Sequence, residues 1–262
     1  MSYIDTHCHL DHHGERSVAE QVRRARQAGV STMITVGTDL ASSIQAVATA
    51  ARYDGVWAAV GIHPNDAIEA TPRVLEAIEE LARDPVCVAV GETGRDHYRD
   101  HTSPAQQDAA FRAQIDIAKR TDRTLVIHCR DAWPEVLATL DEVGAPDRVV
   151  MHCFSGDVEV VARCAEAGYY ASFAGNVTFR NAGPLRGAAA VVPPDLLLTE
   201  TDSPYLTPHP HRGEANDPSF VPFTARTLAE VQGMSEAALL EQVAANTVRA
   251  FALPGGVVEN RA

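Results

Sequence analysis

The segment His7-Cys8-His9 places two imidazoles close together near the start of the chain, two residues after the carboxylate of Asp5. Tyr3-Ile4 before them predict a strand. Side chains alternate between the two faces of a strand, so Asp5, His7 and His9 are expected on one face and Cys8 on the other. Two imidazoles on one face are typical of metal binding. Because the chain has 11 histidines in 262 residues, one such pair can also arise by chance.

Further polar residues follow other apolar runs of the chain at the same relative position. They are His63 in VGIHP, Glu92 in VGETG, His128 in VIHCRD, His152 in VMHCFSG, and Glu200 and Asp202 in LLTETDSPYL. Each one alone is compatible with a hydrogen-bonded polar residue at a strand end. Their joint occurrence predicts a site for divalent ions such as zinc, manganese or magnesium. These histidines and carboxylates together exceed the needs of one ion, so two ions about 3.5–4 Å apart are expected.

The five cysteines are odd in number, widely spaced and without a Cys-x-x-Cys pair, which predicts free thiols. Cys8, Cys129 and Cys153 each neighbour a candidate histidine. If the histidine faces the site, alternation turns the cysteine outward as a small buried group. We therefore expect no thiolate ligands.

Eight short apolar runs are predicted to form strands, with amphipathic stretches between them. The runs are Tyr3–Thr6, Thr32–Val36, Val56–Val60, Val86–Val90, Thr124–Ile127, Arg148–Met151, Tyr169–Phe173 and Leu196–Thr199. Such runs are typical of parallel strands that are buried on both faces. The alternation predicts an α/β fold, a (β/α)₈ TIM barrel with the site at the carboxyl ends of its strands. An open doubly wound sheet is the alternative, but no Gly-x-Gly-x-x-Gly follows the first strand.

The segments between these strands carry helix signals. Ser103 to Gln106 form a capping box with Pro104 at the first helical position, and Asp39 is expected to cap another helix. Helical faces are predicted for Val18, Val22, Ala25 and Gly29 and for Phe111, Ile115 and Ala118, and further helices over Leu40–Arg52, Pro72–Arg83, Pro222–Val231 and Ser235–Phe251. A long loop is expected from Ser203 to Pro222. We predict a single domain over residues 1–262, with a flexible tail at about 255–262.

The composition restricts the partners of this chain. It carries 22 basic and 35 acidic residues, a net charge of −13, which opposes avid binding of long nucleic acid. A phosphate-containing substrate therefore requires bound cations or a few arginines. No apolar run reaches the length of a membrane span, and charged residues begin at Asp5, so a soluble, cytoplasmic protein without a signal peptide is expected. No segment indicates an obligate protein partner.

In this chain IDTHCHLD, GIHP, GETGRD, IHCRDA, HCFSG and ETDSPYLTP occur in order. This series resembles that of the TatD-like metal-dependent deoxyribonucleases, within the metallo-dependent hydrolase superfamily. The resemblance extends from Ile4 to about Thr247. It implies two metal ions: one held by His7, His9 and Asp202, the other by His128 and His152, with Glu92 bridging them.

Two details distinguish this chain among similar barrels. Some related hydrolases bridge their metals with a carboxylated lysine, but the only lysine, Lys119, lies on a predicted helix. Arg95 and His97 stand where the family usually has an apolar and an aromatic residue, which is expected to alter a loop beside the metals. Cys129 in place of a common serine is chemically mild.

The resemblance implies hydrolysis of phosphodiester bonds in DNA by a metal-activated water. Asp202 can act as general base, and Glu92 and His63 are further catalytic candidates. Asp5 and Glu200 are expected to support the ligands from behind. Arg130 and Arg212 are candidates for phosphate contacts, although surface salt bridges explain them equally well. Tyr205 is a candidate for base stacking, although packing is the favoured explanation of this residue. The acidic balance favours short or single-stranded DNA ends as substrate.

Two other functions are compatible with these residues. Metal-bound hydroxide also attacks carbonyl groups, so an esterase or amidohydrolase, including one for aminoacyl esters on RNA, is the main alternative. The other is a non-catalytic metal-binding scaffold, which the intact set of candidate ligands disfavours.

Overall fold

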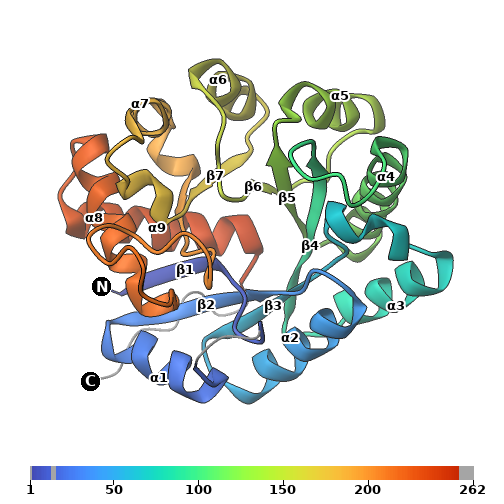
Figure 1. The fold of residues 1–262 in the computed structure, drawn as a ribbon, viewed down its shortest axis with the longest axis horizontal. Helices are drawn as coiled ribbons and strands as arrows, with labels where there is room; N and C mark the ends of the chain where they lie inside the picture. The colour runs from blue at the N-terminus through green and yellow to red at the C-terminus, as the bar shows by residue number, and fades with distance from the viewer. Residues whose placement is uncertain (1, 13–15, 254–262) are drawn as a thin grey trace. The chain divides into compact units, whose positions relative to one another are not determined.

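The computed structural model describes residues 2–12 and 16–253. Its eight strands form one sheet in the order β1 to β8, and helices connect them (Figure 1). This order confirms the predicted (β/α)₈ fold class. The chain divides into two compact units, Met1–Thr35 with Cys153–Ala262, and Val36–His152, which are described in turn. The tail expected at 255–262 lies outside the described residues.

The first unit contains strands from both ends of the chain: β1 (Tyr3–Cys8), nearly all of β2 (Val30–Val36), β7 (Tyr170–Phe173) and β8 (Leu197–Thr199). Strand β1 pairs in parallel with β2, and β7 with β8. Strands β8 and β1 are also neighbours, because Thr199 Oγ1 donates to the carbonyl of Ile4 at 2.8 Å and Cys8 forms a parallel bridge with Ser203. The helices of this unit are α1 (Val18–Gln27), α6 (Val158–Glu166), α7 (Gly183–Val191), α8 (Val221–Gln232) and α9 (Glu236–Phe251).

The second unit contains β3 (Val56–Val60), β4 (Cys87–Asp96), β5 (Thr124–Arg130) and β6 (Val149–Met151). Helices α2 (Leu40–Arg52), α3 (Pro72–Ala82), α4 (Pro104–Thr121) and α5 (Trp133–Val143) lie on one side of these strands (Figure 1). A 3₁₀ helix, η1 (Pro64–Glu69), follows β3. All three strand pairs in this unit are parallel.

Local signals in the sequence mark where α2 and α4 begin. The side chain of Asp39 accepts from the backbone of Ser42 at 2.7 Å, and Ser103 forms the predicted capping box with Gln106. The predicted apolar face of α4 is buried at Phe111, Ile115 and Ala118. These helix predictions are therefore confirmed.

Two strands continue beyond their apolar runs. Strand β4 extends to Asp96 although its apolar run ends at Val90, and β5 extends to Arg130 beyond Ile127. Their register pairs Gly94 with His128 and Asp96 with Arg130. The polar ends of β4 and β5 are thus held side by side by the sheet itself.

The remaining predictions on organisation are met in part. The five cysteines form no disulfide within the described residues, in agreement with the predicted thiols. The segment from Ser203 to Pro222 is not entirely loop, because a 3₁₀ helix, η4 (Pro218–Phe220), lies within it and α8 begins at Val221. Within residues 2–12 and 16–253, none of the helices combines the length and apolar composition needed to cross a membrane.

Candidate metal centre

The first unit brings His7, His9 and Asp202 together, and we call these residues the first ligand group. The Nε2 atoms of His7 and His9 lie 3.3 Å apart, and Oδ1 of Asp202 lies 3.8 and 3.6 Å from them. Strand pairing creates this arrangement, because the Asp202 backbone N–H donates to the His7 carbonyl at 2.9 Å. Both histidines are buried, whereas 13% of the Asp202 side chain is exposed. Two imidazoles and a carboxylate that converge in this way are a typical donor set for a divalent ion.

Asp5 contacts the backbone of this group rather than its ligand atoms. Its carboxylate accepts from the backbone N–H of His7 at 3.2 Å and from the backbone and hydroxyl of Thr201 at 2.9 and 2.5 Å. Burial raises the pKa of Asp5 to about 8, although the bonds from Thr201 and His7 oppose that shift. Asp5 therefore fastens β1 to the segment that carries Asp202.

Glu200, the other predicted supporting residue, is buried and contacts a different segment of the first unit. Its Oε1 accepts from the backbone N–H of Cys153 at 2.7 Å. Cys153 directly follows His152 in sequence. A contact at that position fixes the turn that begins after β6.

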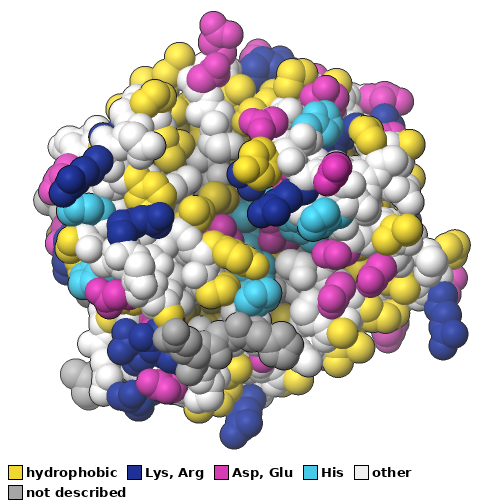
Figure 2. Space-filling view, viewed as in Figure 1, with side chains coloured by type: hydrophobic (Ala, Val, Ile, Leu, Met, Phe, Trp, Pro, Cys, Tyr) yellow, Lys and Arg dark blue, Asp and Glu magenta, His cyan; other side chains and the backbone are white. Residues whose placement is uncertain are grey.

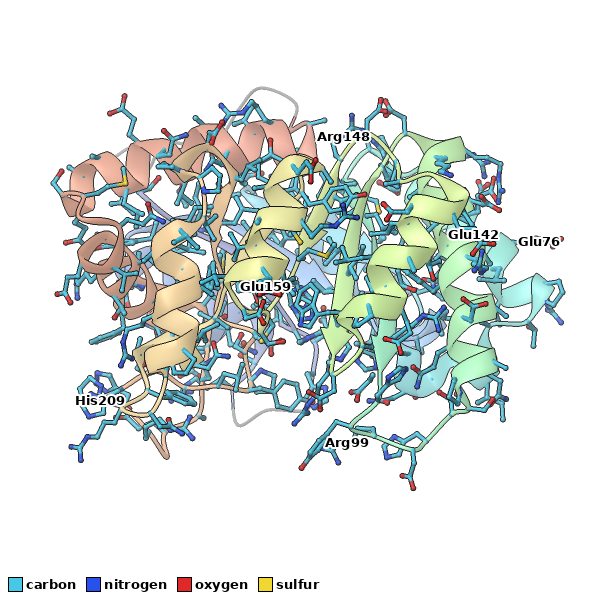
Figure 3. All side chains as sticks on the ribbon, turned by 90° about the horizontal axis from the view of Figure 1, so that it is seen from above. Glu76, Arg99, Glu142, Arg148, Glu159 and His209 are labelled. Atoms are coloured by element: carbon cyan, nitrogen blue, oxygen red, sulfur yellow. The ribbon has the colours of Figure 1, made fainter. Side chains whose placement is uncertain are left out.

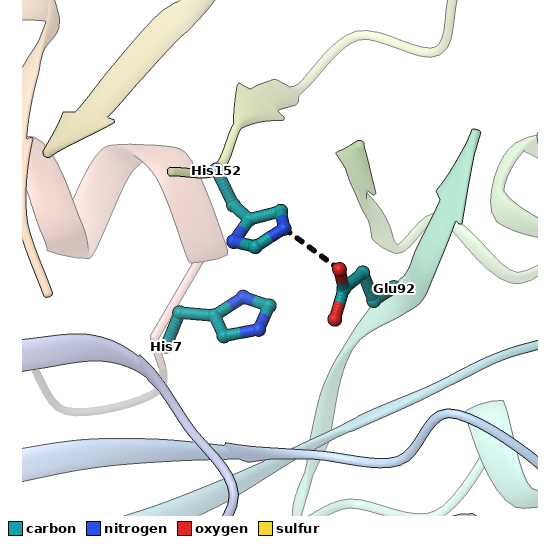
Figure 4. A group of neighbouring side chains, drawn as sticks. All are labelled: His7, Glu92 and His152. Atoms are coloured by element: carbon teal, nitrogen blue, oxygen red, sulfur yellow. Dashed lines mark hydrogen bonds and ion pairs between the residues drawn. The ribbon is translucent and has the colours of Figure 1, made fainter. Parts of the chain in front are cut away.

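The second unit brings together His63, Glu92, His128 and His152, which we call the second ligand group. Oε1 of Glu92 lies 2.7 Å from Nδ1 of His128, 2.8 Å from Nε2 of His152 and 3.4 Å from Nε2 of His63. Figure 4 shows the contact between Glu92 and His152 as a dashed line. One buried carboxylate oxygen thus faces three imidazole nitrogens.

The pKa values in this group follow from these contacts. Burial alone would raise the pKa of Glu92, but the imidazoles of His152, His63 and His128 hold it well below its usual value. Burial alone would lower the pKa of His128, but the bonds to Asp96 and Glu92 raise it. Burial lowers the pKa of His63.

The proton of neutral His63 can be assigned to a ring nitrogen. Its Nδ1 accepts the backbone N–H of Asn65 at 3.0 Å at the start of η1, so neutral His63 carries its proton on Nε2. That N–H points toward Glu92. His63 is therefore suited to donate a hydrogen bond, and less suited to bind a metal through Nε2.

Asp96 contacts the second ligand group without belonging to it, and it was not predicted from the sequence. Its Oδ2 lies 3.3 Å from Nε2 of His128, while its Oδ1 accepts the backbone N–H groups of Tyr98 and Arg99 at 2.8 and 2.9 Å. A carboxylate on the distal nitrogen of a metal-binding histidine is a common way to fix its orientation. Its position could have indicated this role, because Asp96 follows Glu92 by four residues in the same strand and so lies on the same face.

Both groups fit a divalent ion chemically. Their donors are imidazole nitrogens and carboxylate oxygens, and the thiol of Cys8 is turned away to donate to the carbonyl of Ile34 at 3.3 Å. Lys119 lies on α4, where its Nζ donates to the carbonyl of Val143 at 2.7 Å. Lys119 thus lies on a helix, as predicted from the sequence, and its ammonium group is engaged by a backbone carbonyl.

The three predicted substrate contacts lie in different surroundings. Arg130 is the last residue of β5, and its guanidinium lies 3.7 Å from the centre of the Tyr98 ring. Arg212 lies 4.0 Å from the centre of the Phe179 ring and donates to the carbonyl of Thr207. Tyr205 is 51% exposed, with its ring 6.3 Å from that of His9. Tyr205 and Arg130 thus lie near candidate ligands.

The expectation that Arg95 alters a loop beside the metals is wrong. Arg95 lies within β4 and is buried, where it pairs with Asp108 on α4 and donates to Thr139 on α5 at 3.0 Å. Strand alternation explains the difference, because Asp96 then points toward His128 while Arg95 points toward the helices. The prediction that Cys153 turns outward relied on strand alternation. That argument does not apply, because β6 ends at Met151 and alternation does not extend to residue 153.

The fold and these two groups of candidate metal ligands are typical of a metal-dependent hydrolase of the (β/α)₈ class. The chain belongs to the family described as TatD related DNase, whose model matches residues 4–252. It is 43% identical over 259 residues to an uncharacterized metal-dependent hydrolase, TatD, of Mycobacterium tuberculosis, covering 95% of this chain and 98% of that protein. It is 37% identical over 240 residues to the 3'-5' ssDNA/RNA exonuclease TatD of Klebsiella pneumoniae, covering 89% and 91%.

A solved structure supports the same assignment. The crystal structure of YJJV, a TatD homolog from Escherichia coli, superimposes with a TM-score of 0.90 at 29% identity, covering 96% of this chain and 98% of that one. The expected family, fold class and hydrolase class are therefore confirmed.

Proposed function

We propose that this protein removes nucleotides from the ends of single-stranded DNA by hydrolysing phosphodiester bonds. The observation that supports this most is the convergence of three imidazole nitrogens on one oxygen of Glu92, in a chain similar to named exonucleases. A carboxylate held in that way is suited to bridge two ions. We further propose that the two ligand groups together form one two-metal site.

In this proposal His7, His9 and Asp202 would hold one ion, His128 and His152 would hold the other, and Glu92 would be shared by the two. Divalent ions bound there would lower the pKa of a water molecule and offset the charge on the phosphate oxygens. The residues of the chain then position the substrate and move the proton.

Two side chains have roles in the proposed reaction besides ligand binding. The carboxylate of Asp202 is partly exposed and accepts a proton from the attacking water. His63, neutral and protonated on Nε2, donates a hydrogen bond to a phosphate oxygen. Asp5 and Glu200 keep the backbone of the site in place.

The charge of the chain favours short or single-stranded ends over long duplexes. The net charge is −13, which opposes extended contact with a polyanion. On the face shown in Figure 2, however, Lys and Arg side chains are interspersed with Asp and Glu side chains. The part of this face that the structure describes is therefore not continuously acidic. We also propose that the protein acts in the cytoplasm, as expected from its sequence.

The test combines metal analysis with assays on labelled substrates. The metal-loaded protein is incubated with a single-stranded oligonucleotide, the matching duplex and a panel of carbonyl esters. We expect two ions per chain, stepwise shortening of the single strand, and at least a hundredfold loss of activity in Asp202→Asn. The matched control is His209→Ala, an exposed histidine outside both ligand groups, which should keep full activity. Full activity with fewer than two ions would contradict the two-metal site, and hydrolysis of the carbonyl esters alone would overturn the nuclease assignment.

A further inference from the structure

At the carboxyl ends of β4 and β5 in the second unit, an aromatic ring and a guanidinium form an exposed stack. Tyr98 is 61% exposed, and the Cζ atom of Arg130 lies 3.7 Å from the centre of its ring. Arg99, also exposed, has its Cζ 5.6 Å from the same ring. Figure 3 shows Arg99 and Arg148 at opposite ends of this unit. We call Tyr98 and Arg130 the stacking pair.

Hydrogen bonds to the backbone of the loop after β4 fix the stacking pair relative to the second ligand group. Asp96 accepts the backbone N–H of Tyr98 with Oδ1 and contacts His128 with Oδ2. The backbone N–H of His97 donates to the carbonyl of Arg130 at 2.9 Å. One carboxylate therefore links a candidate metal ligand to the loop that presents the aromatic ring.

The position of the stacking pair places it one short step from the candidate ligands. Arg130 follows His128 by two residues along β5, which is about 6.6 Å of strand rise. Tyr98 follows Asp96, the register partner of Arg130, by two residues. A nucleotide whose phosphate lies at His128 and Glu92 therefore has its base within reach of the pair.

The chemistry of the pair selects an unpaired base. Planar guanidinium and aromatic groups stack on the faces of nucleobases, and such contacts tolerate any base. Within a duplex those faces are already stacked on neighbouring base pairs. A surface pair of this kind therefore discriminates by strandedness rather than by sequence.

We infer that Tyr98 and Arg130 form a base-stacking subsite for an unpaired nucleotide next to the cleaved phosphate. This inference rests on the proposed nuclease function and adds how the chain recognises a single strand. It also gives Arg130 a planar stacking role in place of a simple phosphate contact.

The test removes the base and the ring separately. Cleavage of an oligothymidine is compared with cleavage of an oligonucleotide of equal length whose bases are replaced by abasic sites. We expect the unmodified protein to prefer oligothymidine about tenfold in kcat/KM, as stacking on one side chain provides. Tyr98→Ala should lose that preference with little change on the abasic strand, and Tyr98→Trp should keep it.

A matched control comes from a similar pair elsewhere in the same unit. Arg52 lies 5.4 Å from the centre of the Tyr53 ring at the end of α2, before β3, so Tyr53→Ala should keep the preference for oligothymidine. The dissociation constant of a fluorescently labelled oligothymidine, measured by anisotropy, should rise about tenfold in Tyr98→Ala only.

The outcomes separate this inference from the proposed function. Equal losses on both substrates in Tyr98→Ala, or an undiminished preference, would overturn the subsite while the nuclease function stands. If the unmodified metal-loaded protein cleaves neither strand, the proposed function fails and the subsite with it.

Discussion

The Nε2 atom of His128 lies 3.3 Å from Oδ2 of Asp96, while its Nδ1 lies 2.7 Å from Oε1 of Glu92. The imidazole is thus held between two carboxylates. Burial alone would raise the pKa of Asp96, but the bonds from His128 and from the backbone of Arg99 and Tyr98 keep it well below its usual value. The ring orientation of His128 is therefore fixed before any ion binds.

Asp96→Asn is expected to weaken metal binding about 10- to 100-fold, since the orienting carboxylate on His128 is lost. The amide oxygen of the new residue can still accept the backbone N–H groups of Tyr98 and Arg99, so the loop should stay in place. Asp96→Ala removes both functions and should also reduce oligonucleotide affinity. Titration against a chromogenic chelator measures the metal affinity, and Asp100→Asn, an exposed carboxylate nearby, serves as control. Unchanged affinity in a folded Asp96→Asn protein would refute the orienting role.

Arg95→Ala is expected to destabilise the protein by about 2 kcal/mol without changing metal affinity. The substitution removes one of the two arginines that pair with Asp108, the other being Arg112, and it removes the hydrogen bond from β4 to Thr139 on α5. Urea unfolding measures the loss, and Arg99→Ala, at an exposed position, should stay within about 0.5 kcal/mol of the unmodified protein. A drop in metal affinity for Arg95→Ala would return this residue to the site.

Metal ions are expected to raise the melting temperature. An ion present at about 100 times its dissociation constant stabilises the folded state by about 2.7 kcal/mol, which corresponds to a rise of about 5–10 °C at this chain length. A chelator should reverse the rise, and Glu92→Gln should remove most of it because the shared carboxylate charge is lost. Glu80→Gln, whose side chain is 82% exposed on α3, is the control. An equal rise in Glu92→Gln would place the ions elsewhere.

Stability is expected to fall above pH 9 in part because of Cys164. Burial raises the pKa of this thiol to about 12, against an ordinary value of 9.0. Between these values the unfolded chain loses the proton and the folded chain keeps it, so rising pH favours unfolding. The effect is about 1.4 kcal/mol at pH 10, one unit above the ordinary pKa, since one pKa unit corresponds to about 1.4 kcal/mol. The unfolding free energy of Cys164→Ala should therefore decline less steeply between pH 8 and 10, and an identical slope would contradict this.

Sequence periodicity located the core strands but not their polar extensions. The apolar run at Val86–Val90 identifies β4, yet the strand continues to Asp96, where polar side chains give no periodic signal. Gly94 permits this continuation, because its φ of +141° is rarely adopted by other residues and a Cβ there would collide with the carbonyl oxygen of His128. The partners of Asp96 and Arg95 depend on that continuation. They could not be inferred from the sequence.

The candidate ligands themselves can be predicted from the sequence because of their position. Each follows a recognisable apolar run, and parallel strands place their carboxyl ends at the same edge of a sheet. The stacking of Arg130 on Tyr98 cannot be predicted from the sequence, because it depends on the register between β4 and β5, which only the structure provides.

Asp96 holds the loop after β4 through main-chain N–H groups alone, and this has a consequence for divergence within the family. The side chains at positions 97–99 can be exchanged without disturbing the anchor, provided that neither 98 nor 99 becomes proline, which lacks the N–H. Under the inferred stacking subsite, base recognition can therefore be changed at these positions independently of the candidate metal ligands. The loop is then a replaceable recognition element beside an unchanged metal site.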